Sequence, residues 1–126
     1  MTSVFPKYED GPPITCHAAG ALVGGRMCRV AAAPNGGNPT VNVPVAGGRT
    51  FGVVAQDVTA GQKQTVYTGR QLIWIEAGAT LAAADLIQSD AAGLAILHAA
   101  GICQGEVLEG GASGALVLVA YNSRSV

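Results

Sequence analysis

Residues 51–96 read FGVVAQDVTAGQKQTVYTGRQLIWIEAGATLAAADLIQSDAAGLAI and contain the clearest structural signals in the chain. Short runs rich in Val, Ile, Thr and aromatic side chains are each followed by turn residues. Gly61, Gly69, Gly78 and the DAAG segment at residues 90–93 supply these turns. Short strands with turn signals about every ten residues are typical of a small all-β sandwich or barrel. We therefore expect a mainly β, single-domain fold with little or no helix.

The rest of the chain shows the same pattern of short strands. The expected strands cover residues 14–19, 26–32, 40–46, 51–56, 64–68, 72–75, 85–89, 94–97, 102–108 and 115–121. Residues 85–89 and 94–97 are expected to form a hairpin, closed by a type I turn in which Gly93 takes the left-handed conformation. The alanine-rich segment before this hairpin favours at most one helical turn, at residues 81–84.

Prolines give two further expectations. Residues 34–39, PNGGNP, predict a loop because Gly, Asn and Pro are turn residues. In residues 40–46, Val41, Val43 and Val45 alternate with other residues, which is the pattern of a half-buried strand. Pro44 lies inside this strand and predicts an edge position for it, because proline lacks the N–H that a central strand donates.

The first part of the chain differs from the rest. Residues 1–13, MTSVFPKYEDGPP, contain three of the six prolines, so we divide the chain into an extended N-terminal arm and a β-rich domain at residues 14–126. Val4, Phe5 and Tyr8 are apolar or aromatic residues within this polar arm. The arm is either a frayed terminus or a segment that becomes ordered against a protein partner, with these three side chains as anchors.

Small side chains dominate the composition. The chain has 22 Ala and 18 Gly among 126 residues, and only six aromatic residues. Such a core buries less apolar area per residue than one built from Leu and Phe. Small domains that lack core often associate with copies of themselves. We therefore expect apolar surface to be buried between subunits, with Trp74, Leu116, Leu118 and Tyr121 as the candidate interface residues because they lie in the two most apolar runs.

Charge and cysteine usage argue against several classes of protein. Lys and Arg are scattered singly and the net charge is −1, so we expect no nucleic-acid binding, which needs a basic stripe. We recognise no signal peptide, and the longest apolar run is far shorter than the roughly 20 residues that span a bilayer. Cys16, Cys28 and Cys103 form no CxxC pair, which indicates free thiols in a reducing compartment.

No motif in the chain indicates catalysis, a metal or a cofactor. Cys16 and His17 are adjacent, so in a strand they point to opposite faces and cannot both bind one metal. Residues 111–114, GASG, are one residue short of a hydrolase elbow. We therefore expect no enzyme and no cofactor. A small β module that binds a ligand or metal through Cys16, His17 and His98 remains an alternative.

Four segments together resemble a known family: FGVVAQD at residues 51–57, AG at 60–61, EAGA at 76–79 and DLIQSDAAG at 85–93. Their order resembles that of the capsid decoration proteins of tailed bacteriophages, also called cement or head-stabilisation proteins, over about residues 45–120. The sequence departs from the family at Ala84, where relatives often have Gly, and at Leu94, where Arg is common.

The resemblance implies a fold and a function. The fold is expected to be of the β-tulip type and to assemble as a trimer. Such trimers bind the outer capsid surface of the virion and clamp neighbouring major capsid subunits, which stabilises the expanded shell. The N-terminal segment often binds the shell in this family, which assigns that role to Val4, Phe5 and Tyr8. The protein would be made in the host bacterial cytoplasm. Another β-rich virion component, such as a tail tube or head–tail connector, is the alternative.

Overall fold

Two β-sheets form the protein. The computed structural model describes residues 8–10 and 13–123. Eleven strands lie within these ranges, and the described residues contain no helix. The expectation of a mainly β, single-domain fold with little or no helix is therefore confirmed. In chain order the strands are β1 (Tyr8–Asp10), β2 (Ile14–Ala18), β3 (Met27–Asn35), β4 (Asn38–Asn42), β5 (Gly52–Val54), β6 (Lys63–Thr68), β7 (Arg70–Glu76), β8 (Leu86–Ser89), β9 (Ala95–Leu97), β10 (Gly105–Glu109) and β11 (Leu116–Asn122).

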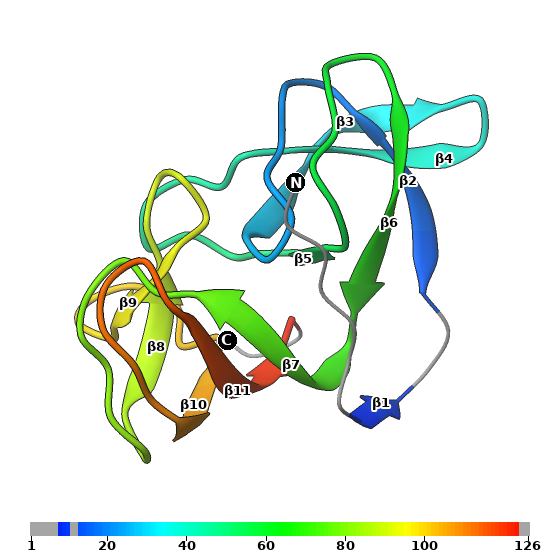
Figure 1. Ribbon diagram of the computed structural model, residues 1–126. Helices are drawn as coiled ribbons and strands as arrows, with labels where there is room; N and C mark the ends of the chain where they lie inside the picture. The colour runs from blue at the N-terminus through cyan, green and yellow to red at the C-terminus, as the bar shows by residue number, and fades with distance from the viewer. Residues whose placement is uncertain (1–7, 11–12, 124–126) are drawn as a thin grey trace.

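The first sheet is a closed barrel. Its strand order is β2-β4-β3-β5-β6, and it lies at the upper right of Figure 1. Strand β2 closes it, because it pairs in parallel with β4 and antiparallel with β6. Small and aliphatic side chains fill the interior. They are Cys16, Ala18, Leu22, Cys28, Val41, Val54 and Val66.

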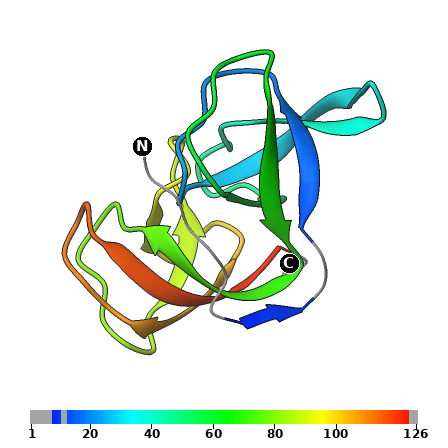
Figure 2. The same cartoon turned by 45° about the vertical axis from the view of Figure 1, so that its right-hand side comes forward.

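The second sheet has six strands in the order β1-β7-β11-β10-β8-β9. Every strand pair in it is antiparallel, and β7 and β11 pair along their whole length. Its inner face packs against the outside of the barrel, which contributes Met27, Val53, Ala55 and Tyr67 to a second core. Figure 2 shows the two sheets from a second angle, with the barrel on one side of the six-stranded sheet.

Backbone hydrogen bonds join the barrel to the six-stranded sheet. The Met27 N–H donates to the Gly93 carbonyl at 2.9 Å, and the Glu76 N–H donates to the Gly25 carbonyl at 2.8 Å. Beside them, Arg26 forms a salt bridge with Glu76 through two N–O contacts of 3.1 and 3.2 Å. The β8–β9 turn therefore rests directly on the start of β3.

The expected hairpin at residues 85–97 is present. The Asp90 carboxylate accepts hydrogen bonds from the Ala92 and Leu94 N–H groups, as turn aspartates commonly do. Gly93 has a φ of +86°, which confirms its expected left-handed conformation.

The expected loop at residues 34–39 is wrong. Strands β3 and β4 continue to Asn35 and from Asn38, so only Gly36 and Gly37 form the turn. Both glycines have positive φ, +61° and +84°, as the tightest hairpin turns require. Figure 1 shows this hairpin projecting from the barrel.

One further segment differs from expectation. Strand β4 ends at Asn42, so Pro44 follows the strand instead of lying inside it. At residues 81–84, where at most one helical turn was expected, there is none, and the Asp85 carboxylate accepts a hydrogen bond from the Ala82 N–H at 2.8 Å. This turn holds Ala84 at a φ of +74°, the left-handed conformation that favours glycine.

Candidate assembly surface

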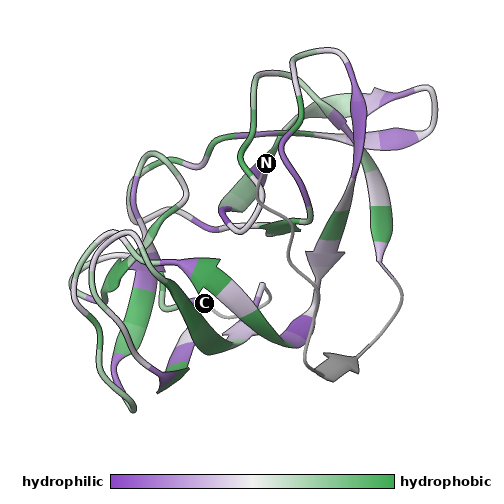
Figure 3. Ribbon diagram, viewed as in Figure 1, coloured by the Kyte–Doolittle hydropathy of each residue, from purple (hydrophilic) through white to green (hydrophobic). Residues whose placement is uncertain are grey.

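The outer face of the six-stranded sheet, turned away from the barrel, is strongly apolar along β7 and β11. Successive strand residues point to opposite faces. Because the odd-numbered residues of both strands are buried, Leu72, Trp74, Leu116 and Leu118 lie on the outer face. Trp74 is directly opposite Leu118, and Leu72 is opposite Ala120. Figure 3 shows the hydrophobic colouring of both strands.

Strands β8 and β10 extend this surface. Glu106 pairs with Leu86 on one side and with Ala120 on the other, and Glu109 pairs with Leu118. Leu108 lies at the bulge between the two glutamates and is 44% exposed. We call this surface the leucine face. It consists of Leu72, Trp74, Leu86, Leu108, Leu116 and Leu118, together with Glu106 and Glu109.

The leucine face is unusual for an antiparallel sheet. Such sheets commonly bury one face and present polar residues to water on the other. Here Leu86 is 47% exposed and Leu116 is 40% exposed, whereas Trp74 is partly buried against the core. A large exposed apolar patch on a protein surface marks an interaction site. The face therefore has the character of a protein interface.

Three of the four candidate interface residues lie on the leucine face, and the fourth does not. Trp74 and Leu116 are accessible on the leucine face, and Leu118 lies on it but is only 8% exposed. Tyr121, contrary to expectation, points inward. It is 1% exposed, and its hydroxyl lies 2.7 Å from the Thr50 Oγ1. Tyr121 is an odd-numbered residue of β11, and the odd-numbered residues of this strand point toward the barrel. Burial raises the pKa of Tyr121 above its ordinary value.

The structure describes one of the three candidate shell-binding residues. Val4 and Phe5 are outside the described residues. Tyr8 belongs to β1, an edge strand whose backbone pairs with β7 so that Tyr8 is opposite Leu72. Part of the expected arm is therefore a strand of this chain's own sheet.

The residues of the metal-binding alternative do not come together. Cys16 points into the barrel and is 1% exposed, and burial raises its thiol pKa to about 11. His17 is on the outer side of β2, and the His98 Nε2 lies 2.8 Å from the carbonyl oxygen of Gly101. Among the described residues, no three His, Cys, Asp or Glu side chains are grouped as a metal site.

No helix in residues 8–10 and 13–123 is long and apolar enough to cross a membrane.

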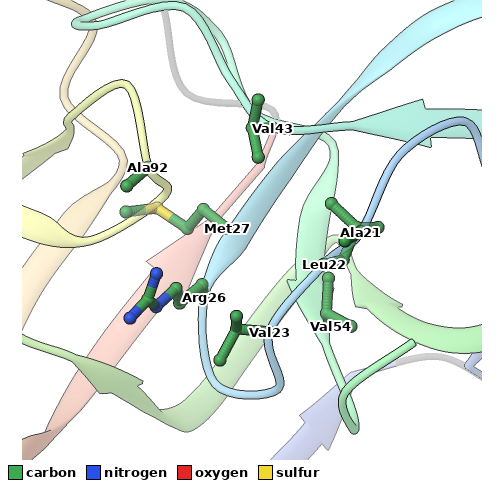
Figure 4. A pocket seen from close by; sticks show the side chains of 8 residues that line it. All are labelled: Ala21, Leu22, Val23, Arg26, Met27, Val43, Val54 and Ala92. Atoms are coloured by element: carbon green, nitrogen blue, oxygen red, sulfur yellow. The ribbon is translucent and has the colours of Figure 1, made fainter. Parts of the chain in front are cut away.

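A hollow of about 100 Å³ lies between the barrel and the β8–β9 turn. Figure 4 shows its lining, which is apolar except for Arg26. Val43 borders it and is 39% exposed, and Val45 beyond it is 61% exposed. The sequence suggested that both valines face inward in a strand, but the strand ends at Asn42. The alternation does not show where the strand ends, so it could not predict that Val43 and Val45 are exposed.

Comparison with known proteins finds a likeness among solved structures. No family model matches the chain, and no curated protein matches it. Among solved structures, it is similar to the head fiber gp8.5 N base of bacteriophage phi29, with a TM-score of 0.74 and 15% sequence identity. The match covers 91% of this chain and 97% of that one. The chain has the fold of a phage head fibre base. Because the match covers nearly all of both chains, the likeness includes both sheets of this protein.

Proposed function

We propose that this chain is a structural protein of a tailed-phage virion that binds the outer surface of the capsid as a trimer. It stabilises the expanded shell by clamping neighbouring major capsid subunits. The observation that carries this proposal is the whole-chain likeness to a phage head fibre base, at a TM-score of 0.74. The segments that resemble capsid decoration proteins also indicate a protein of the phage head.

The leucine face supports self-association. Leu86, Leu108 and Leu116 are each between 40% and 47% exposed. At about 25 cal/mol for each Å² of apolar surface removed from water, covering such side chains is favourable. The barrel covers the opposite face of the same sheet, so a second protein surface would complete the burial of both faces.

Three copies in one particle would act as a multivalent clamp. Once one subunit of a trimer binds the shell, the others bind at a high effective concentration, which raises avidity by roughly 10² to 10⁴. A protein that binds only the expanded shell stabilises that state by mass action. In this proposal, Val4, Phe5 and Tyr8 of the N-terminal segment supply contacts with the shell.

Binding to capsids tests the proposal. Capsids of the phage that encodes this chain, prepared without it, would be mixed with purified protein in the unexpanded and expanded forms and sedimented. We expect saturable binding to expanded capsids alone, in multiples of three copies, and a higher temperature of capsid disruption. Absence of binding to either form, or assembly of the free protein into tubes or stacked rings, would contradict the proposal.

A matched pair of variants identifies the surface involved. Leu116→Lys places a charge on the leucine face, whereas Leu97→Lys places one on an exposed leucine of β9 outside that face, 52% exposed against 40% for Leu116. We expect only Leu116→Lys to abolish the trimer and, with it, the avidity for capsids. The Leu97→Lys control shows whether loss of any exposed leucine has the same effect.

A further inference from the structure

The leucine face carries an unbalanced negative charge. Glu106 and Glu109 are both exposed and lie in register with its apolar residues. Within the described part of the chain neither forms a salt bridge, and the ion pair found there joins Arg26 and Glu76. If two copies met through this face alone, the glutamates of one would lie against those of the other. Like charges placed together at an interface are costly.

A second group of residues, at the end of β4, has the opposite charge. It consists of the half-buried Arg29, which pairs with Asn42, and the exposed Val43, Val45 and Arg49; we call it the valine–arginine patch. The Arg29 Nε donates to the Val43 carbonyl at 3.0 Å, and the Gly48 N–H donates to the Val45 carbonyl at 2.8 Å, directly before Arg49. Neither arginine forms a salt bridge with a described residue.

The two surfaces match in chemistry and differ in position. Each combines exposed aliphatic side chains with two unpaired charges, negative on the leucine face and positive on the valine–arginine patch. The patch borders the apolar hollow on the barrel side of the sheet. The leucine face is on the other side, so one copy cannot join them within itself.

We propose that the leucine face of one copy packs against the valine–arginine patch of the next copy. Glu106 and Glu109 then lie against Arg29 and Arg49, and a leucine side chain enters the hollow beside Val43. An interface between two different surfaces generates a ring when its rotation closes. This inference rests on the proposed trimer and specifies how its subunits meet.

Charge reversal tests the pairing. The face variant is Glu106→Lys with Glu109→Lys, the patch variant is Arg29→Glu with Arg49→Glu, and the combined variant carries all four changes. Sedimentation velocity over a concentration series gives the trimer dissociation constant of each. We expect each double variant to weaken the trimer at least about tenfold, since each opposes like charges. The combined variant restores the opposite charges and should return to within about threefold of the unmodified protein.

A salt series on the unmodified protein and a single substitution test the pairing even if the patch variant does not fold. The unmodified trimer should dissociate more readily as sodium chloride rises, because salt screens exposed charges. Arg49→Glu alone changes an exposed residue and serves if the patch variant does not fold. Double variants without effect, or weakened trimers that the combined variant does not restore, overturn the pairing but leave the trimer intact. A monomeric unmodified protein would instead remove the trimer from the proposed function.

Discussion

Gly93 joins the two sheets, and replacing it with alanine should destabilise the fold strongly. Gly93 has a φ of +86°, and a Cβ built there would overlap the Met27 carbonyl oxygen. Its own carbonyl accepts the Met27 N–H at 2.9 Å. Alanine therefore meets both an unfavourable backbone conformation and the backbone of β3, which cannot move without breaking the connection between barrel and sheet.

The magnitude follows from these two effects. The left-handed conformation costs an alanine about 1–2 kcal/mol, and a lost backbone hydrogen bond costs about 1 kcal/mol. We expect Gly93→Ala to lower the free energy of unfolding by about 2–3 kcal/mol. Gly61 is a matched control, because its φ is +85° and no heavy atom lies within 4 Å of a Cβ built there. Gly61→Ala should cost only the backbone part, about 1–2 kcal/mol, which is about 1 kcal/mol less than Gly93→Ala.

Chemical denaturation at one fixed protein concentration measures both variants. The fixed concentration matters because subunit association adds to apparent stability. The difference between the two variants isolates the contact between the β8–β9 turn and β3. Equal losses for Gly93→Ala and Gly61→Ala would refute the reasoning, because they would show that the contact contributes nothing beyond backbone conformation.

Three other changes follow from the described contacts. Ala84→Gly should raise the free energy of unfolding by about 0.5–1 kcal/mol in denaturant titration, because Ala84 has a φ of +74° and glycine removes that cost; a loss of stability would contradict this. Tyr121→Phe should lower it by about 1–2 kcal/mol, since it leaves the buried Thr50 hydroxyl without its partner; an unchanged value would show that the bond is unimportant. Burial raises the pKa of Cys16 to about 11 and that of Cys28 further. The folded state therefore holds protons that the unfolded thiols release, so stability should fall as pH rises from about 9 to 11. Cys16→Ala should reduce this loss of stability with pH. An unchanged dependence of the free energy of unfolding on pH would contradict the role given to the Cys16 thiol.

Local patterns predicted the strands and the turns that depend on near neighbours. The apolar run at residues 72–75 indicated a strand, and DAAG at residues 90–93 indicated the turn that the structure contains. Ala84 drew attention because glycine is common there in the resembling family, and its positive φ explains that preference.

Contacts between distant residues account for what the sequence did not predict. The barrel closes through the parallel pairing of His17 with Thr40, which no local pattern indicates. Tyr121 was assigned to an interface because β11 is apolar throughout. Which of its faces meets the barrel depends on packing with β3 and β5, not on the strand's own sequence. The valine–arginine patch was missed because strand β4 ends at Asn42.

A cryo-electron microscopy reconstruction of capsids carrying the bound protein would show where the protein sits and how its subunits meet. We expect trimers on the outer surface at threefold or quasi-threefold positions, with Trp74 and Leu116 buried in contacts between subunits. A reconstruction with single copies on the shell, or one in which the leucine face is turned to solvent, would contradict this expectation.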